Sequence, residues 1–213
     1  MTNFIPIFPL SIVVYPGEDL NLHIFEPRYK QLIKECIEQK KPFGIPSVVE
    51  NAVTDLGTLV EVVELVKEYE DGKMDISTKG IKVFRVLEVI KEIPDKLYSG
   101  AIVNYPNNEI ALLPLRMKKL LAGVRELHKL LKVDKDFKKP DEQLSSYDVA
   151  HHTGMSLQEE YELLSLMQED QRLEYLKRHI TKVVPVLSQM ENLKEKIKLN
   201  GHFKDLKGFN FDA

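Results

Sequence analysis

Histidines are the first residues to test for metal or acid–base chemistry, and His151 and His152 form the only adjacent pair in the chain. Neighbouring positions on a helix project about 100° apart, which is poor geometry for sharing one metal ion. His23 lies in an alternating run, where a hydrogen-bonded structural histidine is the simpler interpretation than a catalytic one. We therefore predict no metal site and no cofactor.

Other catalytic patterns are missing from the sequence. It contains no G-x-x-x-x-G-K-[ST] phosphate loop, no G-x-G-x-x-G turn and no G-x-S-x-G elbow. A single cysteine, Cys36, excludes a zinc site built from cysteine pairs, and its apolar surroundings favour a core position. The carboxylates lie on predicted helix faces, where solvation explains them. No set of residues supplies nucleophile, base and orienting group, so we predict no catalytic residue.

One pattern is compatible with DNA binding. Residues Asp148–Ser156 have the alanine and glycine spacing of a helix-turn-helix, followed by a helix that begins at Leu157. That helix carries Glu159, Glu160 and Glu162, which would repel phosphates. Two helices packed at an angle are the favoured interpretation.

Composition sets the broad class of protein. The chain has 213 residues, 43% apolar residues, 30% charged residues and a formal net charge of -3, as expected of a globular protein without a general attraction to nucleic acid. The N-terminus has no basic region before an apolar run, and no stretch is apolar enough to span a membrane. With one cysteine the chain fits a reducing compartment, so we expect a cytoplasmic protein.

The elements that would position any site fall into two groups. The first half is predicted to form extended segments at Ile5 to Leu10, Leu20 to Phe25, Phe43 to Ile45, Leu59 to Lys67, Met74 to Thr78, Ile81 to Ile90 and Tyr98 to Tyr105. Turns are expected at Pro16-Gly17, Asp71-Gly72 and Gly80. One helix is expected over Glu26 to Lys40. Short strands with one inserted helix indicate a closed or nearly closed barrel.

The second half changes character after Pro106-Asn107-Asn108 and is predicted to be helical. Helices are expected from Ala111, over Glu142 to His151, over Leu157 to Met167 and from Asp170 to a stop at Asn200-Gly201, with a kink or restart at Pro185. Ser156 and Glu159 have capping-box spacing. The tail carries Phe203, Phe209 and Phe211, which either stay mobile or dock into a groove. We place the boundary between residues 1–108 and 109–213.

A run of motifs in the first half resembles a known family. They are Phe8-Pro9-Leu10, Val13-Val14-Tyr15-Pro16-Gly17, the stretch from Leu20 to Tyr29, Phe43-Gly44-Ile45, Gly57-Thr58, Asp71-Gly72, Gly80 and Phe84-Arg85-Val86. In this order they resemble the N-terminal substrate-binding domain of ATP-dependent Lon proteases. The match is looser in the helical half.

The resemblance implies an α+β fold: an N-terminal PUA-like pseudo-β-barrel with one inserted helix, followed by a C-terminal α-helical bundle. It also implies binding of unfolded or misfolded polypeptide, or action as a protease adaptor. The chain ends at Ala213 without the ATPase and protease modules, so we expect a non-enzymatic module that works with a protease or chaperone. RNA or small-molecule binding through the barrel is the alternative, and the acidic balance counts against RNA. The oligomeric state stays open.

Two groups of residues are assigned roles. Tyr15, Tyr105 and Leu112, on the turns beside the barrel and at the start of the bundle, are suggested peptide contacts. A structural role is expected for the motif residues Pro16, Gly17, His23, Phe25, Glu26, Pro27, Arg28 and Tyr29. Among them, Glu26 and Arg28 are expected to form an ion pair at the corner between barrel and helix, with Phe25 and Tyr29 in the core below.

Overall fold

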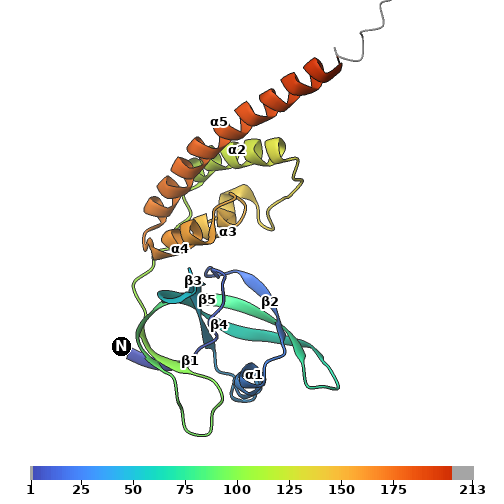
Figure 1. Ribbon diagram of the computed structural model, residues 1–213. Helices are drawn as coiled ribbons and strands as arrows, with labels where there is room; N and C mark the ends of the chain where they lie inside the picture. The colour runs from blue at the N-terminus through green and yellow to red at the C-terminus, as the bar shows by residue number, and fades with distance from the viewer. Residues whose placement is uncertain (1, 203–213) are drawn as a thin grey trace, which may run out of the picture.

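Six antiparallel strands form one sheet in the computed structural model, which describes residues 2–202 (Figure 1). The strands are β1 (Thr2–Pro6), β2 (Asp19–Ile24), β3 (Phe43–Val49), β4 (Ala52–Glu68), β5 (Met74–Ile90) and β6 (Gly100–Asn104). Five of them follow the order β1-β6-β5-β4-β3, and β2 pairs with the first part of β5. The predicted Asp71-Gly72 hairpin is confirmed, because it connects β4 to β5.

The sheet closes on itself. After β1 the chain runs beside β3, where the Phe8 amide donates to the Gly44 carbonyl (2.8 Å) and the Val48 amide donates to the Leu10 carbonyl (2.8 Å). These bonds join the segment that follows β1, the first strand of the order, to β3, the last, and the closed sheet confirms the predicted barrel. Regular pairing of the first strand ends at Pro6, and prolines 6 and 9 supply no amide donors to continue it.

Bulges curve the two long strands. The register between paired strands skips one residue at Val63, Val66, Ile81 and Leu87, and each of these side chains is exposed. An extra residue bends a strand and increases its twist, which helps close a small barrel. The prediction of a turn at Gly80 was wrong, because β5 continues through it with a bulge at the next residue.

Helix α1 (Pro27–Gln39) lies across the barrel from the other helices (Figure 1). Its buried face, with Leu32, Ile33 and Cys36, packs against Phe43 and Met74 of the barrel. The predicted core position of Cys36 is confirmed, since its side chain is buried.

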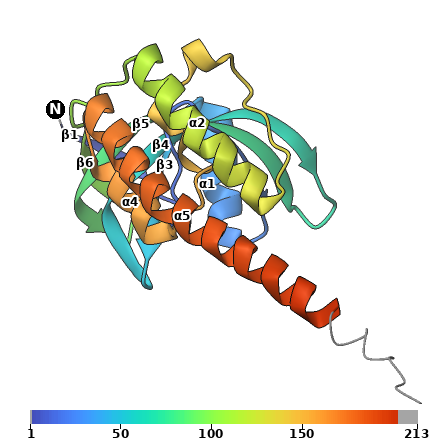
Figure 2. The same ribbon diagram turned by 90° about the horizontal axis from the view of Figure 1, so that it is seen from above.

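The second half forms a helical bundle on the barrel. Its helices are α2 (Pro114–Leu131), a 3₁₀ turn (Asp141–Gln143), α3 (Ser146–Ala150), α4 (Leu157–Ser165) and α5 (Glu169–His202). Helices α2 and α5 lie side by side, and α5 runs on past the end of α2 (Figures 1 and 2). The shorter α3 and α4 lie between this pair and the barrel (Figure 1).

Several helix predictions need correction. The segment Glu142 to His151 holds a 3₁₀ turn and the short α3 in place of one helix. Helix α5 passes through Pro185 as one element, so the expected restart is wrong, while a kink there stays a prediction. The helix continues beyond the expected stop at Asn200-Gly201. The capping box at Ser156 is confirmed, because its hydroxyl accepts from the Glu159 amide and the Glu159 carboxylate accepts from the Ser156 amide. The tail with its three phenylalanines lies outside the described residues.

One hydrophobic core joins barrel and bundle. Val13, Tyr15, Leu56 and Val83 of the barrel belong to the same buried cluster as the inner faces of α2 to α5. The strands end at Asn104 and the helices begin at Pro114, and the division at residue 108 stays a prediction. Within residues 2–202, no helix is both long and apolar enough to cross a bilayer.

Candidate functional site at the barrel–bundle junction

Tyr15 is the residue on which barrel and bundle meet. Its side chain is fully buried, its ring stacks on Tyr147 of α3 with centroids 5.1 Å apart, and its hydroxyl donates to the Glu160 carbonyl of α4 (3.0 Å). Burial, with Glu160 and Glu18 nearby, raises the pKa of Tyr15. The hydroxyl therefore stays a protonated donor across the physiological range.

A histidine between two carboxylates closes the junction beside this ring. His151 Nδ1 lies 2.7 Å from Glu160 Oε1, and its Nε2 lies 3.2 Å from Glu18 Oε2. Burial by itself lowers the pKa of His151, but the hydrogen bonds to Glu160 and Glu18 outweigh it and raise the pKa to about 9. The imidazolium form therefore connects the Pro16-Gly17 turn of the barrel to α4 of the bundle.

Glycines shape the barrel side of the junction. Gly17 has a positive φ of 87°, and its amide donates to the Gly80 carbonyl (2.9 Å). A Cβ at Gly80 would lie 2.2 Å from the Tyr15 carbonyl oxygen, so only glycine allows β5 to approach this turn. The Glu18 carboxylate accepts from the Tyr15 amide (2.8 Å), which orients it toward His151.

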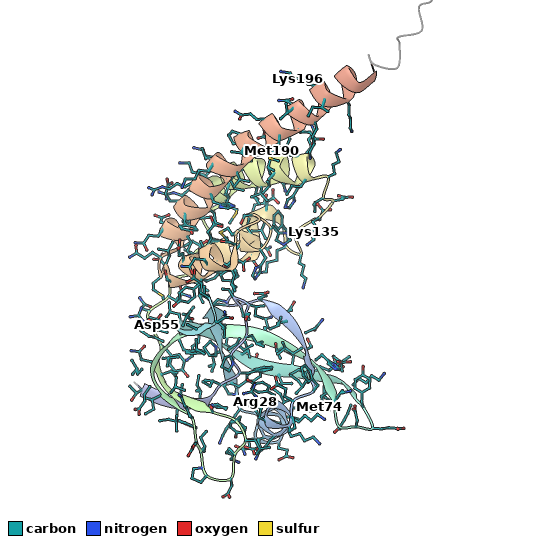
Figure 3. All side chains as sticks on the ribbon, viewed as in Figure 1. Arg28, Asp55, Met74, Lys135, Met190 and Lys196 are labelled. Carbon is teal, nitrogen blue, oxygen red and sulfur yellow. The ribbon has the colours of Figure 1, made fainter. Side chains whose placement is uncertain are left out.

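An open cleft of about 610 Å³ lies at the edge of the junction. One side is the turn Pro16 to Asp19 of the barrel. The other is formed by α3 and by the connector between α2 and α3 (residues 132–145). Phe137 of this connector packs edge-on against His152 with centroids 4.9 Å apart. Lys135 lies on the same connector, at the level of α3 in the bundle (Figure 3). The cleft thus has the aromatic side chain of Phe137 on one side and the tight turn at Pro16-Gly17 on the other.

Charges of both signs line the cleft. Lys138 Nζ lies 3.1 Å from Asp19 Oδ2, and Lys139 Nζ lies 2.6 Å from Asp148 Oδ1. Burial raises the pKa of Asp148, but Lys139 and the bonds from Ser145 outweigh it and hold the pKa below its usual range. These pairs fasten the connector to the barrel and to α3, which shapes the cleft without making it uniformly basic.

The neighbouring histidine has the opposite character. Burial, together with the nearby Lys135 and His128, lowers the pKa of His152. Its backbone carbonyl lies 2.8 Å from His128 Nε2 on α2. A neutral imidazole beside Phe137 adds apolar surface to the cleft. Among residues 2–202, no cluster of three or more histidine, cysteine or acidic side chains is placed to hold a metal ion.

The three suggested peptide contacts do not come together. Tyr15 is 0% exposed, so the structure corrects the expectation that it contacts a peptide: stacking and hydrogen bonding hold its side chain in the core. Tyr105 is half-buried, with Lys82 Nζ 3.7 Å from its ring centroid. Leu112 is 55% exposed on the segment before α2. Neither Tyr105 nor Leu112 lines the junction cleft.

The motif residues have mostly structural surroundings. The Glu26–Arg28 ion pair is confirmed (2.8 Å), Pro27 begins α1, and Tyr29 is buried with its ring stacked on Phe8 (3.8 Å). Phe25 is a correction, because it is 58% exposed and stacks near His23 at the surface. Phe25 directly follows Ile24, the buried last residue of β2. Because neighbouring residues of a strand face opposite sides, the side chain of Phe25 points away from the core.

His23 and the turn residues complete this group. The His23 Nδ1 atom lies 2.6 Å from Asp75 Oδ1, so the predicted hydrogen-bonded histidine is confirmed. The turn at Pro16-Gly17 is also confirmed, since Glu18 N donates back to the Tyr15 carbonyl (3.2 Å). All of these side chains belong to the barrel or its corner.

The segment with the helix-turn-helix pattern packs against the barrel. Helix α4 faces the barrel, where Glu160 O accepts from Tyr15 and the Tyr161 hydroxyl donates to Asp55. Its first turn is therefore held against protein, which supports the interpretation of two packed helices.

Apart from Pro16 and Gly17, sequence reasoning missed the residues that line the junction cleft. Phe137 stood in a charged connector, and His151 looked like an ordinary residue near a helix end. The single aromatic residue among eight mostly charged positions (134–141) was the only signal in the sequence for this surface. The partners Glu18 and Glu160 are separated from each other by most of the chain, and no local pattern connects them.

The fold and the junction define an α+β module in which a closed antiparallel barrel is fastened to a helical bundle. The sequence model of the ATP-dependent protease La (LON) substrate-binding domain matches residues 5–182. The chain belongs to this family.

Two solved structures share the fold. One is the Lon N-terminal domain protein from Xanthomonas campestris, with 23% identity, a TM-score of 0.63, and coverage of 83% of this chain and 98% of that chain. The other is the N-terminal domain of the Mycobacterium avium complex Lon protease, with 14% identity, a TM-score of 0.62, and coverage of 85% of this chain and 100% of that chain. The predicted fold class is confirmed by these similarities.

Proposed function

We propose that this chain is a non-enzymatic, cytoplasmic module that binds unfolded or extended polypeptide in the junction cleft. The observation that carries the proposal is the cleft itself, about 610 Å³ between barrel and bundle, with an aromatic side chain on one side and a tight turn on the other. Its size is within the range of ligand-binding clefts. Membership of a substrate-binding domain family supports the same function.

The lining of the cleft suits polypeptides of varied sequence. Phe137 offers apolar contact, while Lys79 and Asp136 offer charges of both signs at the rim. A segment with mixed apolar and charged residues can satisfy such a surface in several registers. The bound segment would then be passed to a protease or chaperone partner.

RNA is the competing ligand, because four lysines line the cleft. Two of these, Lys138 and Lys139, are paired with Asp19 and Asp148. A phosphate contact at either of these two lysines would have to displace a carboxylate, which weakens the binding of a polyanion more than that of a mixed-charge peptide. A polypeptide is therefore the favoured ligand.

The test is a fluorescence anisotropy titration with three labelled probes: reduced and carboxymethylated α-lactalbumin, a structured RNA and an ATP analogue. We expect the unfolded protein to bind and Phe137→Ala to weaken that binding about fivefold, as for loss of one aromatic anchor. Phe4→Ala is the matched control, because Phe4 is exposed on β1. Salt-sensitive RNA binding without binding of the unfolded protein would overturn the proposal.

A further inference from the structure

A second hollow, of about 310 Å³, lies beside the start of α1 and is separate from the junction cleft. Arg28, one of its lining residues, is in α1, on the side of the barrel far from the bundle (Figure 3). Its walls include Val53, Val89 and Leu97, which come from three distant segments and are 48%, 40% and 66% exposed. Exposed apolar side chains that gather around a hollow indicate a binding surface.

Hydrogen bonds hold in place the segment that carries Leu97, the most exposed of these three side chains. The Leu97 amide donates to Gln31 Oε1 of α1 (2.8 Å), and Gln31 Nε2 donates to the Asp95 carbonyl (2.9 Å). Lys96 Nζ donates to both carboxylate oxygens of Glu35 (2.8 Å each). The connector that carries Leu97 is thus fastened to α1 at several points, so the hollow is formed before any ligand arrives.

The charged side chains that line this hollow are both cations. Its lining contains Arg28 and Lys91 and no carboxylate. Arg28 bonds to Glu26 through Nε and Nη2, which uses two of its five N–H donors and leaves three available. Lys91 has no ion-pair partner among residues 2–202. Two cations beside apolar walls are complementary to a group that combines a carboxylate with an apolar side chain.

We propose that this hollow binds the C-terminal residue of a polypeptide that ends in an apolar side chain. The terminal carboxylate pairs with Arg28 and Lys91, and the side chain packs between Val53, Val89 and Leu97. The volume of about 310 Å³ accommodates a chain end better than a long internal segment. The proposal rests on polypeptide being the ligand of this module, and it adds a second contact with a stated chemistry.

The experiment compares two forms of one probe. A ten-residue fluorescein-labelled peptide ending in Ala-Leu is prepared with a free carboxylate and with a C-terminal amide, and each form is titrated against the full chain. We expect the amide to bind about fivefold more weakly, and Lys91→Gln to abolish most of that difference. Leu97→Asp is expected to weaken both forms. Matched controls are Lys118→Gln and Leu115→Asp, both at exposed positions on α2.

The outcomes separate this site from the junction cleft. If the acid and amide forms bind equally while unfolded protein still binds and responds to Phe137→Ala, the C-terminal site is overturned and the proposed function stands. If the acid form is preferred and Phe137→Ala leaves that preference unchanged, the site stands independently of the cleft. No binding of either peptide would also overturn the proposal.

Discussion

Tyr15 and Tyr147 stack face to face across the junction between barrel and bundle, with their ring centroids 5.1 Å apart and their planes 22° from parallel. The Arg172 guanidinium lies over Tyr147, 4.2 Å from the ring centroid. Three planar groups from the barrel, α3 and α5 therefore form one continuous contact. Because all three residues are buried, the relative position of barrel and bundle is set by packing as well as by the chain connection.

Tyr15→Phe tests the hydrogen bond at the end of this contact. The variant keeps the ring but leaves the Glu160 carbonyl without the Tyr15 donor, so we expect the free energy of unfolding to fall by about 1 kcal/mol. Tyr15→Ala also removes buried aromatic surface and is expected to cost about 4 kcal/mol. Urea unfolding measures both. Tyr105→Phe is the control, and an equal loss there would contradict the assignment.

Arg172→Met tests the buried hydrogen bonds and the ion pair that the Arg172 guanidinium makes. The five N–H donors of Arg172 reach Ser146 Oγ, Asn108 Oδ1, the Leu166 and Glu109 carbonyls and Glu169 Oε2. Removing this cation leaves a buried carboxylate unpaired, which is expected to destabilise the protein by about 3–5 kcal/mol. The double variant with Glu169→Gln should recover part of the loss. Arg178→Met, at an exposed position on α5, should change stability by less than about 0.5 kcal/mol.

His151 makes stability depend on pH in the alkaline range. Its pKa in the folded chain is raised to about 9, above the usual value near 6.5, by Glu160 and Glu18. The stabilisation is therefore fully present below about pH 6.5 and is lost as pH rises through 9. We expect the difference in unfolding free energy between the wild type and His151→Gln to shrink from pH 6 to pH 10.

The same assignment can be checked directly. An NMR titration of the His151 imidazole should show a midpoint near 9. A midpoint near the ordinary histidine value would show that the two carboxylates do not hold the charged form.

Gly80→Ala tests the close approach of β5 to the turn. The added methyl would lie 2.2 Å from the Tyr15 carbonyl oxygen, so either β5 or the turn must move, at a cost of about 3 kcal/mol. Gly17→Ala meets open space but keeps a φ of 87°, and backbone strain alone predicts a cost of about 1 kcal/mol. Thermal unfolding of both variants shows which substitution costs more stability. A larger loss of stability in Gly17→Ala than in Gly80→Ala would contradict this account.

Local signals in the sequence determined most of the elements. The apolar spacing from Tyr29 to Cys36 predicted α1, the serine–glutamate pair at Ser156 predicted the start of α4, and Asp71-Gly72 predicted the hairpin. Each signal depends on residues a few positions apart, for which helix periodicity, capping and turn geometry suffice. The order of motifs also indicated the family, and with it the barrel and the bundle.

Only the tertiary structure decided what those elements do together. Gly80 looked like a turn residue, but its role is to allow another backbone to approach a strand. Tyr15 looked like a surface contact, but α3 and α4 cover it. The hollow beside Arg28 is formed by segments that lie far apart in the chain. Burial, charge pairing and cleft shape depend on such long-range contacts, and no local pattern of residue types encodes them.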